Sequence, residues 1–461
     1  MKSRKTKLNG LFALVAILGL AACGTGNNSK PADDTCVPST EVPAVYNGEE
    51  VEVTFWHTMG KANKELLGSL IKSFNAKYPN ITIKESSAAG GYDDLKDLIK
   101  KNIATNTLPT MAFCYPDHVA EYLESGHGGV CVDLTNYIES ETCGFTAEEG
   151  SHKDENGNDV IGVGDYVDAF WREGNSYPKC GVYSLPFAKS TEALFYNKNV
   201  FDENGWSVPK TWDQMWNLCR QIKSTYPDVT PLGYDSDSNM YITLSQQMNI
   251  PFTSAKGAHY LFDNAQAKAM VSDLKAKYDE KLFITKGSSG NGTYTSTKFT
   301  AEEIIMSIGS TGGTTYNGTD NFEVGVAPVP YYDLNNPAVV SQGPSITMFN
   351  TANALQRTAA WLFYKHISTA ENSTLYSVKT GYQPVRYSSY ETDAYKDFSN
   401  AQNSSLFNKV AKVSSDLLDS YFVSPVFVGS ANARNQVGSL LTSVLLGSKT
   451  VDAAFNEPPL I

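Results

Sequence analysis

Apolar residues follow two different periods along residues 51–115. Residues 51–56 (VEVTFW) alternate apolar and polar positions as a strand does, and two further short segments, 81–85 (ITIKE) and 110–115 (TMAFCY), also predict strands. Two stripes with helical spacings of three and four lie between them: Leu67, Leu70, Ile71, Phe74 and Tyr78, then Leu95, Leu98, Ile99 and Ile103. This alternation predicts an α/β sheet with parallel strands, and such sheets bind ligands beyond the carboxyl ends of their strands.

The later part of the chain adds long extended segments and more helices. Residues 182–197 predict one long strand, and residues 322–327 predict another that ends at the prolines of 328–330. Two extended segments, each near a proline or a polar kink, suit a hinge between lobes. Helices are expected at 359–367 and 440–446, and from Thr211 onward, where one apolar stripe contains Trp212, Met215, Trp216, Cys219 and Ile222. Since both tryptophans share this stripe, we expect them in the core.

The N-terminus carries an apolar run at residues 11–22, after four basic residues. A spanning helix needs about 20 apolar residues, so this run is too short and instead predicts a cleaved secretory signal over 1–22. Residues 20–23 (LAAC) resemble the lipobox of bacterial lipoproteins, which implies cleavage before Cys23 and acylation of its thiol. The alternative is a soluble secreted protein with a cysteine at that place. Residues 23–48, rich in small and polar residues, predict a flexible tether.

Length and charge restrict the class of protein. A chain of 461 residues is too long for one ordinary core, which predicts two lobes or domains. The formal net charge is −12, and losing Lys2, Arg4, Lys5 and Lys7 with the signal would make it more negative. An acidic body argues against nucleic acid as a partner. It also argues against direct adsorption to anionic lipid, so membrane attachment would depend on the lipid at Cys23.

The cysteine pattern does not decide between disulfides and free thiols. Six follow Cys23, at positions 36, 114, 131, 143, 180 and 219. An even number in an exported chain is compatible with disulfides, in any of 15 pairings, and buried free thiols are an equal alternative. No CxxC pair occurs, which argues against a thiolate zinc site.

Several short motifs occur in a fixed order over nearly all of the chain after the tether. They are 55–59 (FWHTM), 91–95 (GYDDL), 186–187 with 190–191, 194–198 (LFYNK), 209–213 (PKTWD), 306–313, 325–331 (GVAPVPY) and 379–384 (KTGYQP). With these motifs the chain resembles the extracellular solute-binding proteins of ABC importers. Within that group it is most similar to the glycerol-3-phosphate-binding branch, and maltose-type sugar binders are broader relatives.

The resemblance implies a two-lobed type II periplasmic-binding-protein fold, in which each lobe is a mixed sheet flanked by helices. The expected lobes are discontinuous, with 49–189 plus 330–365 in the first and 190–329 plus 366–461 in the second. It also implies a monomer on the outer face of the bacterial membrane. This monomer would bind its ligand between the lobes, deliver it to a membrane permease, use no cofactor and catalyse no reaction.

Family positions carry over to this sequence residue by residue. Tyr92 and Asp93 match a Tyr-Glu pair that contacts glycerol hydroxyls, Ser190 and Ser310 match hydroxyls near the phosphate, and Gly312 and Gly343 match backbone approaches to the ligand. The remaining family positions are Tyr382 of the KTGY loop, Tyr241 where the branch has a tryptophan, and Arg434 for the phosphate. Residue chemistry adds Trp56, whose ring can pack on a sugar, and His57 at a strand end, which either hydrogen-bonds the ligand or has a structural capping role. Aromatic rings suit the C–H faces of sugars, and carboxylates such as that of Asp93 accept hydrogen bonds from paired hydroxyls.

Departures from the family pattern bear on the ligand. Asp93 is shorter than the family glutamate, one of the paired aromatics near 237–240 is replaced by small polar residues, and the register of Arg434 is not fixed by the pattern. Asp235 and Asp237 would repel a phosphate if they faced the cleft, whereas they could bond sugar hydroxyls. A neutral sugar or short oligosaccharide is therefore the expected ligand, with glycerol-3-phosphate or a glycerophosphodiester as the alternative.

Other classes of protein have weaker signals. Ser69 and Lys72 fit the SxxK motif of penicillin-binding enzymes and 379–381 fits KTG, but the third motif is absent and Ser69 lies inside an amphipathic helix. A glycoside hydrolase would need a particular carboxylate pair that the pattern does not single out. A calcium loop beginning at Asp235 lacks the required glycine and glutamate, since Met240 and Gln246 occupy those positions. A surface adhesin would share the anchor without needing a hinge.

Overall fold

The structure, a computed structural model, describes residues 39–125, 129–290, 292–401 and 405–458. The predicted signal, Cys23 and the first part of the predicted tether lie outside the described residues. Their assignments therefore stay predictions.

The first sheet contains five strands in the order β2–β1–β3–β13–β6. β1 runs parallel to β2 and β3, whereas β13 is antiparallel to both β3 and β6. The predicted strand–helix alternation is confirmed here, and the antiparallel strands make the sheet mixed. The strands are β1 (Val51–His57), β2 (Ile81–Ser87), β3 (Met111–Cys114), β6 (Leu185–Pro186) and β13 (Ser345–Met348).

The second sheet also contains five strands, in the order β11–β7–β10–β8–β9. β8 is parallel to β9 and β10, and β7 is antiparallel to β10 and β11. Two five-stranded mixed sheets match the expected two-lobed architecture. The strands are β7 (Glu192–Asn197), β8 (Thr230–Tyr234), β9 (Phe283–Thr285), β10 (Ile304–Ser310) and β11 (Val324–Pro328).

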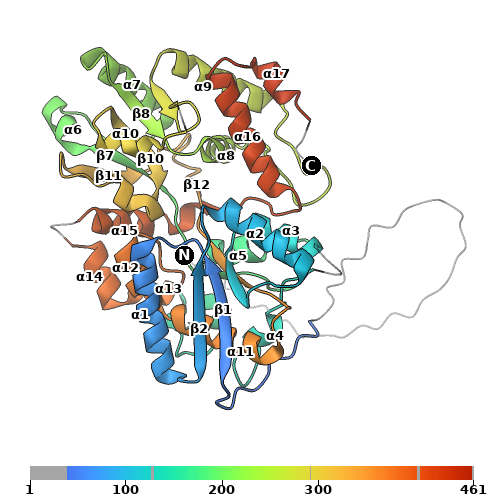
Figure 1. Ribbon diagram of the computed structural model, residues 1–461. Coiled ribbons are helices and arrows are strands. Elements are labelled where there is room, and N and C mark those ends of the chain that lie inside the picture. Colours follow the sequence, from blue (N-terminus) through green and yellow to red (C-terminus); the bar gives the residue numbers. More distant parts are fainter. Residues whose placement is uncertain (1–38, 126–128, 291, 402–404, 459–461) are drawn as a thin grey trace, which may run out of the picture. The chain divides into compact units, whose positions relative to one another are not determined.

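Helices flank both sheets (Figure 1). α1, α2 and α11 pack against the first sheet, while α7, α9, α10 and α15 pack against the second. The longer helices are α1 (Lys61–Lys77), α2 (Tyr92–Thr105), α3 (Pro116–Glu124), α5 (Asp168–Asn175), α7 (Trp212–Thr225), α8 (Asp237–Gln247), α9 (Ala265–Asp279), α11 (Ala354–Ile367), α12 (Ala370–Thr380), α15 (Leu406–Asp416) and α16 (Ser430–Leu445).

Short elements complete the chain. A parallel pair joins β12 (Val339–Val340) to β14 (Tyr421–Phe422), and a hairpin joins β4 (Ser151–Lys153) to β5 (Asp159–Ile161). The short helices are α4 (Thr135–Ile138), η1 (Gly162–Asp165), α6 (Lys198–Asn204), α10 (Thr295–Thr300), η2 (Thr311–Asn317), α13 (Tyr387–Glu391), α14 (Asp393–Ser399), η3 (Leu418–Ser420) and α17 (Val451–Phe455).

The helical stripes form the core as the sequence predicts. Leu67, Leu70 and Phe74 of α1 are almost fully buried. Trp212 and Trp216 of α7 are also buried and stack on each other with ring centroids 5.5 Å apart. The interpretation of these two tryptophans as core residues is confirmed.

The segment expected as one strand over 182–197 is instead two strands in different sheets. β6 belongs to the first sheet and β7 to the second, so residues 187–191 cross between them. In this crossing the backbones of Ser190 and Gln342 exchange two hydrogen bonds, of 3.0 and 2.8 Å. Gln383 donates its backbone N–H to the carbonyl of Lys189 at 2.7 Å. Three chain segments thus run together between the sheets, where a hinge was expected.

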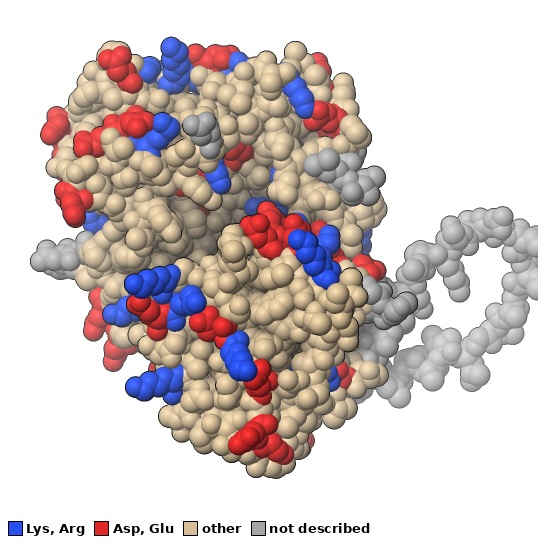
Figure 2. Space-filling view, viewed as in Figure 1, with Lys and Arg blue, Asp and Glu red and all other residues tan. Residues whose placement is uncertain are grey.

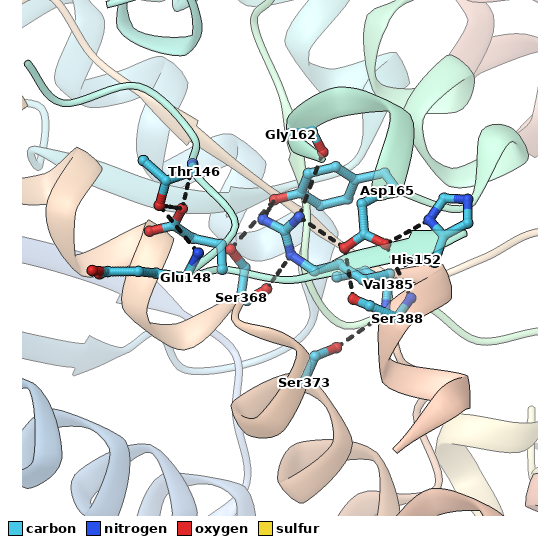
Figure 3. A network of polar contacts seen from close by, with 12 residues as sticks. Thr146, Glu148, His152, Gly162, Asp165, Ser368, Ser373, Val385 and Ser388 are labelled. Carbon is cyan, nitrogen blue, oxygen red and sulfur yellow. Dashed lines mark hydrogen bonds and ion pairs between the residues drawn. The ribbon is translucent and has the colours of Figure 1, made fainter. Parts of the chain in front are cut away.

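A buried ion pair ties the hairpin region to the C-terminal part of the chain (Figure 3). Arg386 and Asp165 are both fully buried, with 3.4 Å between guanidinium and carboxylate. Asp165 also accepts from Ser388 and lies 2.9 Å from His152, and Arg386 donates to the hydroxyl of Tyr166. Such pairing is what makes a buried charge tolerable. The network fixes the chain shortly after Tyr382.

The cysteines divide into two groups. Cys180 is disulfide-bonded, whereas Cys114, Cys131, Cys143 and Cys219 are free. Cys36 lies outside the described residues. Within the described part of the chain, no helix has both the length and the apolar character needed to span a membrane.

Candidate functional site

A cavity of about 1370 Å³ opens between elements of the two sheets. Its wall on the first-sheet side includes Tyr92 at the start of α2, Tyr115 before α3 and Glu173 of α5. The opposite wall comes from β7, the β8–α8 turn, α10, the β10–η2 junction and α16. The crossing residues 340–343 also line it. On the face seen in Figure 2, acidic and basic side chains are interspersed, and the surface is hollowed near its middle.

Seven of the eleven predicted contact residues line this cavity. Ser190 and Ser310 lie beside each other, with 3.4 Å between their hydroxyl oxygens. Gly312 is needed at its position, because a Cβ there would lie 2.9 Å from a ring carbon of Tyr382. The lining residues among the predictions are Tyr92, Ser190, Ser310, Gly312, Gly343, Tyr382 and Arg434.

The other four predicted contacts are not part of the cavity wall. Tyr241 is fully buried on α8, a helix that packs closely on α16. His57 is fully buried too, with its Nε2 2.9 Å from Glu85 and its Nδ1 accepting the backbone N–H of Met59. Trp56 is half-buried and packs against the core. Each of these three side chains packs against other parts of the protein and does not line the cavity.

Asp93 is exposed beside the cavity rather than in its wall. Its carboxylate lies 3.7 Å from His118 and 3.5 Å from Lys96. The proximity of His118, with help from Lys96, lowers the pKa of Asp93 to about 2. The neighbouring Tyr92, not Asp93, lines the cleft, because successive residues of α2 point in different directions.

Tyrosine rings form one part of the wall, and one of them was not predicted. Tyr92 and Tyr115 lie with ring centroids 4.4 Å apart. Burial raises the pKa of both hydroxyls, and the proximity of Tyr382 raises each further. Tyr115 follows β3 directly, so its place at a strand end was the available signal. Together these rings offer apolar faces with polar tips, a combination that suits sugars.

A chain of hydrogen bonds that the sequence did not reveal lies on the opposite wall. Glu192 of β7 accepts from the hydroxyl of Tyr234 at 2.6 Å and from the amide of Asn239 at 2.9 Å. The carbonyl oxygen of the same amide accepts from Arg434 at 2.8 Å. Asn239 therefore links Glu192 to Arg434 and orients the guanidinium. Burial raises the pKa of Glu192 to about 7, although the two donated hydrogen bonds oppose the rise.

Both aspartates of the β8–α8 turn line the cleft. Asp235 accepts hydrogen bonds from the backbone and hydroxyl of Thr295 at 2.6 and 2.7 Å. Asp237 accepts from Thr442 at 2.8 Å and from the backbone of Gly287 at 2.9 Å. These bonds hold the turn in place and keep two carboxylates at the wall.

A second buried ion pair lies beside the cavity, with Glu173 in its wall. Lys189 is fully buried, and its ammonium lies 2.6 Å from Glu173 and donates to the carbonyl of Gly343 at 3.0 Å. Ser341 donates to the same carboxylate at 2.7 Å. The pair thus connects α5 to two of the segments that cross between the sheets.

Carboxylates outnumber basic groups among the lining residues that the structure describes. The acidic side chains are those of Asp117, Glu173, Glu192, Asp235 and Asp237, and the basic ones are Lys286 and Arg434. Ser69 would be the nucleophile if the SxxK motif were that of a penicillin-binding enzyme. It is exposed on α1, where its hydroxyl donates to the carbonyl of Glu65. It is not part of the cleft wall.

Comparison with known proteins places this geometry in context. The profile of the family described as bacterial extracellular solute-binding protein matches residues 69–403. The sn-glycerol-3-phosphate-binding periplasmic protein UgpB of Brucella melitensis is 23% identical over 370 residues, which cover 76% of this chain and 78% of the relative.

Solved structures share the fold at lower identity. The GacH receptor of Streptomyces glaucescens, studied unliganded and with acarbose, superimposes with a TM-score of 0.71 at 19% identity, over 88% of this chain and 96% of that one. UgpB of Mycobacterium tuberculosis, in complex with glycerophosphocholine, gives 0.69 at 18% identity, over 88% and 95%. Both comparisons support the two-lobed mixed fold.

Proposed function

The chain belongs to the bacterial extracellular solute-binding proteins, and from that premise we propose that it captures a sugar or short oligosaccharide between its lobes and delivers it to an ABC permease. The observation that carries the proposal is the cavity, which takes its walls from both sheets and from the segments that cross between them. A ligand in contact with both walls favours the closed arrangement, which a membrane partner can recognise. The proposed lobes are 49–189 plus 330–365 and 190–329 plus 366–461, and members of this family bind solutes without reacting with them.

The chemistry of the cleft favours a neutral sugar over a phosphate. Serine and threonine hydroxyls, carboxylates and tyrosine rings dominate the wall, and these groups bond hydroxyls and pack on C–H faces. A phosphate carries up to two negative charges and needs a fixed guanidinium. Arg434 is held by Asn239, but Asp235 and Asp237 share its wall and would repel the anion. Glycerol-3-phosphate or its diesters remain the alternative, supported by the UgpB relatives.

A thermal-shift screen tests the proposal. The probes are mono- and oligosaccharides, glycerol-3-phosphate and glycerophosphocholine, each at saturating concentration. At 100 times its Kd, a ligand that binds only the folded protein stabilises it by about 2.7 kcal/mol, so a sugar is expected to raise the Tm by several degrees. The Tyr382→Ala variant should lose most of this shift, because Tyr382 lies in the wall.

Each result of the screen has a consequence. A shift with glycerophosphates alone would replace the sugar by the alternative ligand. Release of reducing sugar from a glycan by the purified protein would contradict a purely binding function. No shift with any probe would count against both ligand classes.

We also propose that the protein is held on the outer face of the membrane by a lipid on Cys23. Support comes from the resemblance of residues 20–23 to the lipobox and from the extracellular character of the family. The Cys23→Ser variant should move from the membrane fraction to the soluble fraction of fractionated cells, with its ligand binding intact. Retention of this variant in the membrane fraction would contradict the anchor.

A further inference from the structure

Two exposed tyrosines stand at the cavity on the side of the second sheet. Tyr316 belongs to η2 and Tyr294 precedes α10, and these two elements pack against each other and against β10. Both residues line the cavity, yet 74% of Tyr316 and 54% of Tyr294 remain exposed. They contrast with Tyr234 and Tyr241 of the same lobe, which are fully buried. A single exposed ring on a protein surface is ordinary, but two exposed rings at the same ligand-sized cavity point to an interaction with what the cavity binds.

Their backbones are fixed in place. Residue 295, next to Tyr294, donates both its N–H and its hydroxyl to Asp235. Ser310 caps the start of η2, since its hydroxyl accepts from the backbone of Gly312, and the backbone N–H of Thr311 donates to the carbonyl of Thr191 at 2.8 Å. The ammonium of Lys286 lies 3.7 Å from the ring centre of Tyr294 and constrains that ring. Two exposed rings on anchored segments form a pre-arranged surface, which binds at a lower entropic cost than a mobile loop.

The exposed rings continue the aromatic wall of the inner cleft. An added Cβ at Gly312 would lie 2.9 Å from the Tyr382 ring, and one at the adjacent Gly313 would lie 3.8 Å from the Tyr316 ring, so η2 brings Tyr316 close to Tyr382. Tyr382 in turn lies near Tyr92 and Tyr115. The tyrosines of the first-sheet wall, Tyr382, Tyr316 and Tyr294 therefore all line one cavity.

The cavity is also larger than a small solute needs. Pockets for drug-sized ligands have volumes of about 300–1,000 Å³. The volume here is about 1370 Å³. A single sugar or glycerol-3-phosphate would leave much of this space to water, whereas an oligosaccharide would reach its rim.

We propose that Tyr316 and Tyr294, together with Lys286, form an outer sugar subsite, so that the preferred ligand is an oligosaccharide whose chain extends from the inner cleft to the rim of the second lobe. Each ring offers an apolar face for the C–H face of a sugar unit, and the Lys286 ammonium donates to its hydroxyls. The inference rests on the proposed sugar-binding function and defines the size of the ligand.

Calorimetric titration with oligosaccharides of increasing length tests the subsite. The probes are α-1,4-glucan, β-1,4-glucan and β-1,4-xylan oligomers from two to five units, with the matching monosaccharides and glycerol-3-phosphate. The natural protein is expected to bind the longer members of one series about tenfold more tightly than the disaccharide of that series. A tenfold gain in affinity corresponds to about 1.4 kcal/mol of binding free energy. The double variant Tyr294→Ser with Tyr316→Ser should lose this gain and keep the affinity for the disaccharide.

Tyr332→Ser is the matched control, because Tyr332 is 55% exposed but is not among the cavity-lining residues. It should behave as the natural protein at every length. Affinity that does not depend on length, or a gain with length that survives in the double variant, would overturn the subsite while leaving sugar binding intact. Equal loss for all lengths in the double variant would also overturn it. Binding of a monosaccharide or glycerol-3-phosphate alone contradicts the subsite, and absence of all binding contradicts the proposed function as well.

Discussion

Gly343→Ala is expected to lower the free energy of unfolding by about 3–5 kcal/mol, because two effects combine at this residue. Gly343 has φ +91°, in the left-handed region, and an added Cβ would lie 1.9 Å from the carbonyl oxygen of Ala188. The crossing segments would have to separate. Their separation would break the backbone hydrogen bonds between Ser190 and Gln342 and the bond from Lys189 to the carbonyl of Gly343.

Urea unfolding of this variant and of Gly257→Ala measures the effect. Gly257 also has a positive φ, +71°, but nothing lies within 4 Å of an added Cβ. The control should therefore lose only the backbone cost of about 1–2 kcal/mol. Equal losses in the two variants would show that the close approach between the crossing segments does not contribute.

Glu192→Gln is expected to change how stability depends on pH. The folded-state pKa of Glu192 is raised from 4.5 to about 7 by burial, so the native protein keeps a proton that the unfolded chain releases between these values. Stability from this group is therefore greatest below about pH 4.5, falls as the pH rises to about 7, and is constant above that. Glutamine has no such proton. The stability of the variant relative to the natural protein should thus rise by up to about 3 kcal/mol between pH 4.5 and pH 8.

Urea unfolding at closely spaced pH values measures this difference. Glu203→Gln removes a carboxylate from an exposed position and serves as the control, with a stability profile close to that of the natural protein. Parallel profiles for the natural protein and Glu192→Gln would contradict a buried, proton-binding carboxyl at this place. Since Asn239 donates to Glu192 and accepts from Arg434, ligand affinity measured on the same samples reports whether the guanidinium depends on this link.

Local periodicity predicts the elements of this protein well, because it depends only on neighbouring residues. The stripes of α1 and α7 and the alternation of β1 and β2 are observed, whereas in the stripe of α2 Leu95 and Ile99 are buried but Leu98 is exposed. Pairing between distant segments is not encoded in this way. β13 joins β3 from more than 200 residues along the chain, and residues 182–197 are divided between two sheets where an unbroken apolar pattern predicted one strand.

The candidate site shows the same division. Seven of the residues predicted from family motifs lie in the cleft wall, because a motif marks a position on the shared course of the backbone. They failed for Tyr241, because a residue's position along α8 does not show which way its side chain faces, and this one faces the core. Glu192 and Asn239 carried no local signal. Glu192 is a single glutamate in a strand, and its hydrogen-bonding role depends on distant residues. Tyr234 and Asn239 lie 42 and 47 residues along the chain, and Arg434 lies much farther.

Small-angle X-ray scattering of the protein, without ligand and with the sugar identified by the thermal-shift screen, tests capture between the lobes most directly. Closure around the ligand predicts a smaller radius of gyration at saturation, and no such change for Tyr382→Ala at the same sugar concentration. Unchanged scattering from the natural protein, at a concentration that calorimetry shows to be saturating, would contradict capture between the lobes.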